Sequence, residues 1–131
     1  MPWMKTPNRL SVTLPLPSRA LNPNTRTHWA VKAKAVQVYR GEAKTVTRVA
    51  IREAGLDVPP WGDVEIMVRA TFWFRVNRRR DRDNAQASLK SALDGIADAV
   101  GVDDVRFVMF PVSLLVDSDD PRVEIVLSPI T

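Results

Sequence analysis

The chain has 131 residues, 45% of them apolar, which suits one domain with a hydrophobic core. It contains no cysteine and a single histidine, so disulfides, thiolate metal sites and zinc sites with several imidazoles are excluded. Oxygen ligands remain, and these favour magnesium or manganese. No apolar run reaches the length of a membrane span and the first ten residues lack the core of a signal peptide, so we expect a cytoplasmic protein.

The net charge of +4 is unevenly distributed along the chain. Residues 1–52 contain ten Lys or Arg and one acid, Glu42, whereas residues 53–131 contain nine Lys or Arg and fourteen acids. A basic half joined to an acidic half indicates a polyanion bound by the first and a metal ion held by the second.

The basic half predicts one short strand and one long helix. We expect residues 1–10 to be flexible and residues 11–14 to form a strand that two prolines end. Residues 21–28 are rich in turn formers, and Thr27 is the expected N-cap of a helix over 29–54 that ends at Gly55. The apolar stripe of this helix is Val31, Ala35, Val38, Tyr39, Val46, Val49 and Ala50.

Five cations of this helix point away from the apolar stripe. The first is Lys32, and the other four repeat every fourth residue, at Arg40, Lys44, Arg48 and Arg52. Such a row is most often a solvated helix face. Because only Glu42 offsets these charges, contact with a DNA backbone is an equally good interpretation.

The acidic half predicts a strand over 64–74, a helix over 84–100, and two further strands over 105–112 and 122–127 joined through a turn at 117–120. The helix should bury Leu89, Ala92, Leu93, Ile96 and Val100. This order of elements predicts an α+β fold: a single small domain over 1–131, with a mixed β-sheet and two main helices packed on one face.

Two carboxylates stand between the predicted strand and helix. In an extended chain Asp81 and Asp83 project to the same side, with Arg82 opposite. Asp83 also suits the N-cap of a helix beginning at Asn84, which is a common structural role but leaves Asp81 unexplained. Neighbouring carboxylates repel unless a cation separates them, and a divalent metal is the usual one.

A second acidic pair, Asp103-Asp104, follows the helix. Alone it indicates a polar loop. A following antiparallel strand would return the chain beside the strand that ended near Val76, which favours a shared site. Lys90 lies about two helical turns after Asp83 and could reach back toward it, or it could simply pair with Asp94.

Arginines surround the first acidic pair at positions 78, 79, 80 and 82. Cations keep carboxylates ionised and bind phosphate, so arginines beside a metal site indicate phosphodiester chemistry. Asn84 suits a hydrogen bond to the metal ligands, or the start of a helix. His28, in the basic loop with Arg26, is more often a structural residue.

These motifs resemble the RusA-type Holliday junction resolvases. The likeness covers residues from about Val12 to Leu127, and it comprises Leu14-Pro-Leu-Pro17, the arginines before Asp81-x-Asp83-Asn84, Lys90-Ser-Ala-Leu-Asp94-Gly, and Asp103-Asp104. One position departs from the pattern. In the best-known member the lysine follows Asp-x-Asp by about one turn, where Ala87 stands here, and Lys90 lies a turn later.

The resemblance implies a homodimeric, magnesium-dependent endonuclease that cuts four-way DNA junctions by paired symmetric nicks, with Mn²⁺ as an expected substitute. By position, it implies that Asp81, Asp83 and Asp104 bind the metal and that Lys90 is catalytic. We expect Asn84 and Asp103 to support these residues. Branched DNA is the expected partner, without a small-molecule cofactor or a membrane, in a bacterium or phage. The expected DNA contacts are Arg26, Lys32, Arg40, Lys44, Arg78, Arg79, Arg80 and Arg82.

Two other functions fit the same sequence. A less selective magnesium nuclease would cut flaps or forks as readily as junctions. A non-catalytic DNA-binding protein would use its aspartates only to cap helices and to stay in solution. A module that binds proteins through the helix over 29–54 is a weaker third interpretation.

Overall fold

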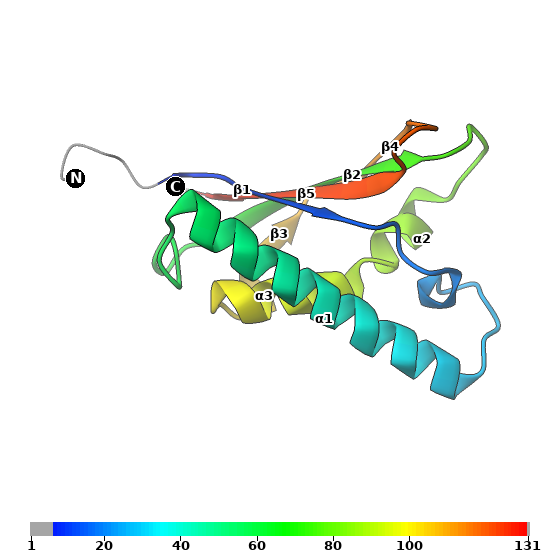
Figure 1. Ribbon diagram of the computed structural model, residues 1–131, viewed down its shortest axis with the longest axis horizontal. Helices are drawn as coiled ribbons and strands as arrows, with labels where there is room; N and C mark the ends of the chain where they lie inside the picture. Colours follow the sequence, from blue (N-terminus) through cyan, green and yellow to red (C-terminus); the bar gives the residue numbers. More distant parts are fainter. Residues whose placement is uncertain (1–6, 131) are drawn as a thin grey trace.

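A computed structural model describes residues 7–130, which form one mixed five-stranded sheet with helices on one side of it (Figure 1). The strands are β1 (Leu10–Leu14), β2 (Ile66–Phe74), β3 (Phe107–Met109), β4 (Ser113–Val116) and β5 (Arg122–Pro129). The helices are α1 (Trp29–Ala54), α2 (Arg82–Ala87) and α3 (Lys90–Val100), with short 3-10 turns η1 (Arg19–Leu21) and η2 (Asp104–Arg106). The predicted α+β class is confirmed.

The sheet combines antiparallel and parallel strand pairs, and the parallel pairs determine which connection the chain needs. In the sheet, β5 lies between β1 and β2 and is antiparallel to both. The other edge of β2 pairs with β3 along its first half and with β4 along its second half, and both pairings are parallel. A parallel pair requires a crossover connection, and α2 and α3 provide it between β2 and β3.

Alternate residues of the central strands face the helices and form the core. On β2 the buried positions are Ile66, Val68, Ala70 and Phe72, as the alternation predicted. Leu10 was predicted to lie in the flexible N-terminal segment, but it starts β1 and is buried against the same core. Residues 7–9 are exposed and precede the strand, and the part of that prediction for residues 1–6 lies outside the described residues.

Helix α1 has the predicted bounds and buries part of the predicted stripe, since Tyr39 is in the core and Ala35, Val46 and Ala50 pack against it. Its buried residues are spaced four apart, at Tyr39, Ala43, Thr47 and Ile51, whereas Val31 and Val38 are 55% and 50% exposed. The reason is the close approach of α3, since a Cβ added at Gly95 would collide with the carbonyl oxygen of Arg40. The smaller residues Ala43 and Thr47 are fully buried on this face.

The ends of α1 are fixed by local hydrogen bonds. His28, and not Thr27, is the N-cap, and its Nδ1 accepts from the backbone N–H of Ala30 at 3.2 Å. Gly55 ends the helix in the left-handed conformation, as predicted. The buried Tyr39 hydroxyl donates to the carbonyl oxygen of Pro15 at 2.7 Å, which ties the proline-rich segment after β1 to the helix. Burial, with a smaller contribution from Glu42, raises the Tyr39 pKa far above its usual range.

The predicted single helix over 84–100 is wrong in two respects. The helical backbone begins at Arg82, and it is divided at Ser88-Leu89 into α2 and α3. The Ser88 hydroxyl donates to the carbonyl oxygen of Ala85 at 2.6 Å, a back-bonding contact that bends helices. The predicted strand over 105–112 is also replaced, by η2 and the shorter β3, and β4 was not predicted.

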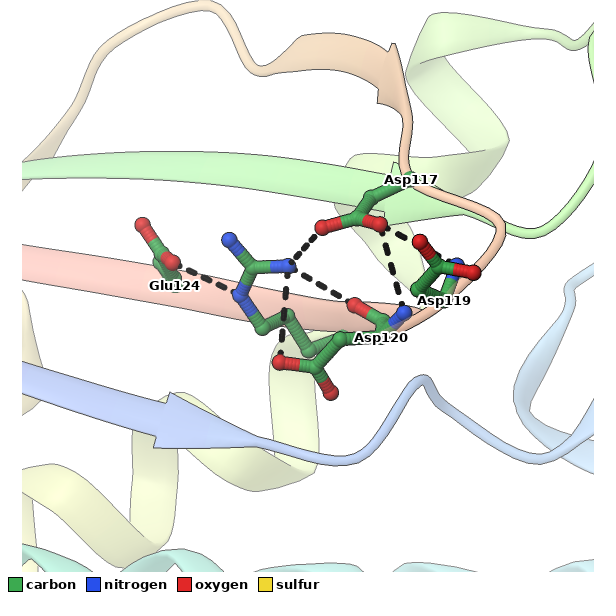
Figure 2. A network of polar contacts seen from close by, with 5 residues as sticks. Asp117, Asp119, Asp120 and Glu124 are labelled. Atoms are coloured by element: carbon green, nitrogen blue, oxygen red, sulfur yellow. Dashed lines mark hydrogen bonds and ion pairs between the residues drawn. The ribbon is translucent and has the colours of Figure 1, made fainter.

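The predicted turn at 117–120 connects β4 to β5 and is organised by Arg122 (Figure 2). Its guanidinium donates to Asp117 at 2.9 Å and to Glu124 at 2.7 Å, and it lies over the Trp73 ring, 4.9 Å from the centroid. The second carboxylate oxygen of Asp117 accepts from the backbone N–H groups of Asp119 and Asp120. The hydrogen bond from Arg122 is the largest cause that lowers the pKa of Asp117 below its usual range.

The first prediction concerns the contact between α1 and α3. Gly95→Ala should lower the free energy of unfolding by about 1–3 kcal/mol, because the added methyl group forces two backbones apart. The matched control is Gly41→Ala on α1, where an added Cβ meets nothing within 4 Å. It should instead stabilise the protein by roughly 0.5–1 kcal/mol. Urea unfolding followed by circular dichroism measures both, and equal effects would contradict the close packing.

The second prediction concerns the Asp117–Arg122 pair. A carboxyl with a lowered folded-state pKa stabilises the fold above its unfolded pKa, about 3.9 for Asp, and this contribution disappears as pH falls through the folded pKa. Asp117→Asn should therefore destabilise the protein at pH 7 and make little difference near pH 2. Thermal unfolding across this range tests it, with Asp57→Asn, an exposed acid outside the network, as the control. A pH-independent effect of Asp117→Asn would count against the ion pair.

Candidate functional site

The predicted helix cap is wrong by two residues, because Asp81 and not Asp83 is the N-cap. Asp81 is the N-cap of α2, and its Oδ1 accepts from the backbone N–H of Asn84 at 3.0 Å. Asp83 lies in the first turn of the helix, where the positive end of the dipole favours an acid. Both residues are exposed. The chain becomes helical at Arg82, so the two carboxylates do not project together from an extended segment as predicted.

Lys90 joins the second acidic segment to α3. Its Nζ donates to Asp104 Oδ2 and to Asp94 Oδ1, each at 2.9 Å. The lysine therefore points to Asp94, as the simpler interpretation held, and also to Asp104, rather than back to Asp83. Hydrogen bonds to Asp104 and then Asp94 raise the pKa of Lys90, and Lys90 is the largest cause of the lowered pKa of Asp104.

Arg40, on the basic helix α1, lies near Lys90 and Asp104. Its Nη2 lies 2.9 Å from Asp98 Oδ2, and the hydrogen bond with Asp98 raises the Arg40 pKa. A shallow depression, which we call the Lys90 depression, is lined by Arg40, Lys90, Asp94, Ala97, Asp98, Val102, Asp103 and Asp104. Asp103 caps η2 by accepting from the backbone N–H of Val105 at 3.0 Å.

The three aspartates expected to bind metal do not form one cluster. Among residues 7–130, no three His, Asp or Glu side chains gather closely enough to hold a metal ion. Asp81 and Asp83 line a small depression with Arg79, Arg80 and Arg82, whereas Asp104 lines the Lys90 depression. In this arrangement the residues do not fit a three-carboxylate site, and their role as metal ligands stays a prediction.

The cause of this separation is the direction of β3. The antiparallel return that the sequence suggested is wrong, because β3 is parallel to β2 and pairs Phe107 with Ile66, at the start of that strand. Asp104 precedes this pair. Asp81, in contrast, comes after the other end of β2.

Asp81 also lines a second, larger groove. It encloses about 800 Å³ between the segment after β1 and the segment after β2. We call it the arginine groove, and it is lined by Leu16, Pro17, Ser18, Arg19, Asn22, Thr25, Phe72, Phe74, Arg75, Val76, Arg78, Arg79, Arg80, Asp81, Asn84, Ala85 and Ser88. It gathers the predicted DNA contacts Arg78, Arg79 and Arg80, together with Arg19 and Arg75, which the sequence analysis missed.

Arg80 differs from the other groove arginines in having a buried side-chain nitrogen without a partner among the described residues. Its guanidinium lies over the Phe74 ring, 3.7 Å from the centroid. Its Nε is buried and has no hydrogen-bond partner among residues 7–130. Burial, followed by the nearby charge of Arg78, lowers the pKa of Arg80.

The remaining predicted contacts are more scattered. Asn84 lines the arginine groove, and Arg82 lines the small depression with Asp83. Arg26 and Lys32 are exposed, and Lys44 is half-buried on α1. None of these last three lines the arginine groove or the Lys90 depression.

Comparisons with known proteins give little further information. No family model matches the sequence. An uncharacterized protein from Xylella fastidiosa (strain Temecula1 / ATCC 700964) is 43% identical over 101 residues, 77% of this chain, and the match spans 64% of that relative's length. A crystal structure of cyanuric acid hydrolase from A. caulinodans aligns with 95% of this chain and 39% of its own, at 16% identity and a TM-score of 0.44, which does not establish a shared fold.

The described residues contain no helix with the length and apolar character needed to span a membrane.

The third prediction concerns Lys90 and Asp104 in metal-free protein. Lys90→Met should raise the pKa of Asp104 toward the ordinary aspartate value, because the largest cause of its depression is removed. The pair stabilises the fold above the unfolded pKa of the carboxyl and loses this effect as pH falls through the lowered pKa. Carbon-detected NMR titration of the carboxylate measures the shift. Lys32→Met on α1 is the control, and an unchanged Asp104 titration in Lys90→Met would contradict the contact.

Proposed function

We propose that this protein is a RusA-type, magnesium-dependent, structure-specific endodeoxyribonuclease that resolves four-way DNA junctions by paired symmetric nicks. The observation that carries the proposal is the 2.9 Å contact between Lys90 and Asp104. It joins two residues of the resemblance that lie on separate elements, and Arg40 from the basic helix lines the same depression. The arginine groove beside Asp81 adds a second cluster of cations suited to phosphates.

The charged side chains have distinct parts in this proposal. Lys90 has a raised pKa, so it stays protonated and offsets negative charge on the phosphate being attacked, rather than acting as a base. Arg40 and the groove arginines orient the DNA backbone. Magnesium, or manganese in its place, would activate water and polarise the phosphate. Because Asp81, Asp83 and Asp104 do not form one cluster, we assign no reaction step to the ion.

The proposed partner is branched DNA, and the proposed assembly is a homodimer in the cytoplasm of a bacterium or of a phage-infected cell. A four-way junction has approximate twofold symmetry and needs two symmetric cuts, which a C2 pair of active sites supplies.

A non-catalytic DNA-binding protein is the second candidate, and a specific observation favours it. Asp81 caps α2, Asp103 caps η2, and Asp104 is paired with Lys90, so each of these acids has a structural partner. In this alternative the aspartates organise the loops while the arginines alone contact DNA. A less selective nuclease acting on flaps or forks is the third candidate and differs from the first only in its substrate.

The fourth prediction concerns junction cleavage and the role of Asp81 in it. The measurement is cleavage of a labelled four-way junction, a linear duplex and a flap, each with magnesium, calcium or a chelator. The wild-type protein should cut the junction in magnesium at symmetric positions. Asp81→Asn should abolish cleavage and retain or strengthen junction binding, because repulsion of the phosphates is relieved. Asparagine caps helices as well as aspartate does, so the fold of α2 is preserved.

Asp119→Asn, in the turn before β5, is the charge-matched control and should cut normally. If Asp81→Asn and the wild type cut the junction equally, the proposed role of Asp81 is refuted. An uncut junction that the wild-type protein nevertheless binds would select the non-catalytic candidate. Equal cutting of junction and flap would select the less selective nuclease.

A further inference from the structure

We propose that the arginine groove binds an unpaired nucleotide of a DNA strand, with the phosphate on Arg80 and the base stacked against the Phe74–Arg80 pair. This inference rests on the proposed function, since it names the part of a branched DNA that the groove would hold. It concerns binding alone, and it requires no metal ion or bond cleavage.

The charge of the groove selects an anion. Its lining contains one acid, Asp81, and five arginines, at positions 19, 75, 78, 79 and 80. These arginines come from η1 and from the segment that follows β2, so the fold brings together cations that are distant in the sequence. A concave surface with one sign of charge focuses the field on its ligand.

Arg80 provides the phosphate contact within this field. Its buried Nε has no hydrogen-bond partner among the described residues, so the charge of this side chain is not satisfied within the fold. The side chain as a whole is only half-buried, so a phosphate would meet the accessible part of the guanidinium. Stacking on Phe74 already holds the guanidinium plane, and less conformational freedom remains to be lost when a ligand binds. An anionic phosphate would also offset the like charge of Arg78, which contributes to the lowered Arg80 pKa.

The floor of the groove selects a base as well as a phosphate. Phe72 is 1% exposed and supports Phe74 from within the core, with the two ring centroids 5.6 Å apart. The surface open to a base is therefore the half-buried Phe74 with the Arg80 guanidinium over it. Leu16 and Pro17 add an apolar wall. Contact with the outside of a duplex needs only cations, whereas an aromatic and guanidinium surface in a recess suits the flat face of an unpaired base.

The opposite wall is held in place by its own hydrogen bonds. Pro15 is anchored by the Tyr39 hydroxyl, and the Ser18 side chain accepts from the backbone N–H of Ala20 at 3.2 Å. The Asn22 side-chain oxygen accepts from the backbone N–H of Asn24 at 2.9 Å, so the amide NH₂ is the group that Asn22 can offer to a base edge. The wall is therefore formed before a nucleotide enters.

The test is fluorescence anisotropy with a short labelled oligothymidine in the presence of a chelator, repeated over a range of salt concentrations. Phe74→Leu and Arg80→Lys should each weaken binding by about tenfold through loss of stacking, with the salt dependence unchanged. Arg80→Ala should weaken binding further and reduce the slope of log K against log salt by about 0.7, the value for one phosphate contact on a single strand.

The control is Arg9→Ala, which removes an exposed cation outside the groove, just before β1, and should bind almost as tightly as the wild type. Thymidine monophosphate should displace the oligothymidine at lower concentration than inorganic phosphate does. Circular dichroism and thermal unfolding verify that each variant is folded, and Arg80→Lys keeps the charge if Arg80→Ala unfolds.

The inference is overturned if Phe74→Leu and Arg80→Lys bind oligothymidine no more weakly than Arg9→Ala. It is also overturned if a duplex of equal length loses as much affinity as oligothymidine in Phe74→Leu, which would make the groove a backbone contact only. Junction cleavage by the wild type is scored separately. Oligothymidine binding through the groove without any junction cleavage refutes the nuclease proposal and supports the groove, and the reverse result refutes the groove alone.

Discussion

The parallel pairing of β2 with β3 is the constraint on which the arrangement of the charged residues depends. Because the two strands run in the same direction, the chain must cross the sheet between them, and α2 and α3 make this crossing. Asp81 therefore stands where the crossing begins and Asp104 where it ends. Lys90 begins α3 and extends to Asp104, so the lysine belongs to the second acidic segment rather than to the first.

The close contact of α1 with α3 joins the basic half of the sequence to the acidic half. Gly95 lets the two helices approach, and this places Arg40 of the basic helix against Asp98 of the acidic half. A cation predicted to contact DNA thereby reaches the depression that contains Lys90 and Asp104. At the other end of the crossing, arginines from η1 and from the segment after β2 form the groove beside Asp81. The fold thus carries one basic groove beside Asp81 and one mixed depression, in which Arg40 and Lys90 lie among four aspartates.

Local signals predicted part of this structure, and tertiary contacts determined the rest. Helical periodicity and Gly55 located α1, and strict alternation located β2, because these patterns arise within one element. The division at Ser88-Leu89 and the direction of β3 depend on packing against other elements, and neither leaves a clear local pattern. In the arginine groove, Arg78 to Arg80 stood out as a run of cations. Arg19 and Phe74 did not, since only the fold brings their separate segments together.

We propose that the Lys90–Asp104 pair takes part in the same reaction as Asp81, although the crossover holds them in different depressions. The decisive measurement is single-turnover cleavage of a four-way junction in magnesium by Asp104→Asn, compared with Asp63→Asn. Asp63 is a suitable control because it is an exposed acid that pairs with Arg106 of η2, the element that Asp104 begins. Asp104→Asn should bind the junction without cutting it, and Asp63→Asn should cut normally. Equal cutting by the two variants would show that the Lys90–Asp104 pair has no part in cleavage.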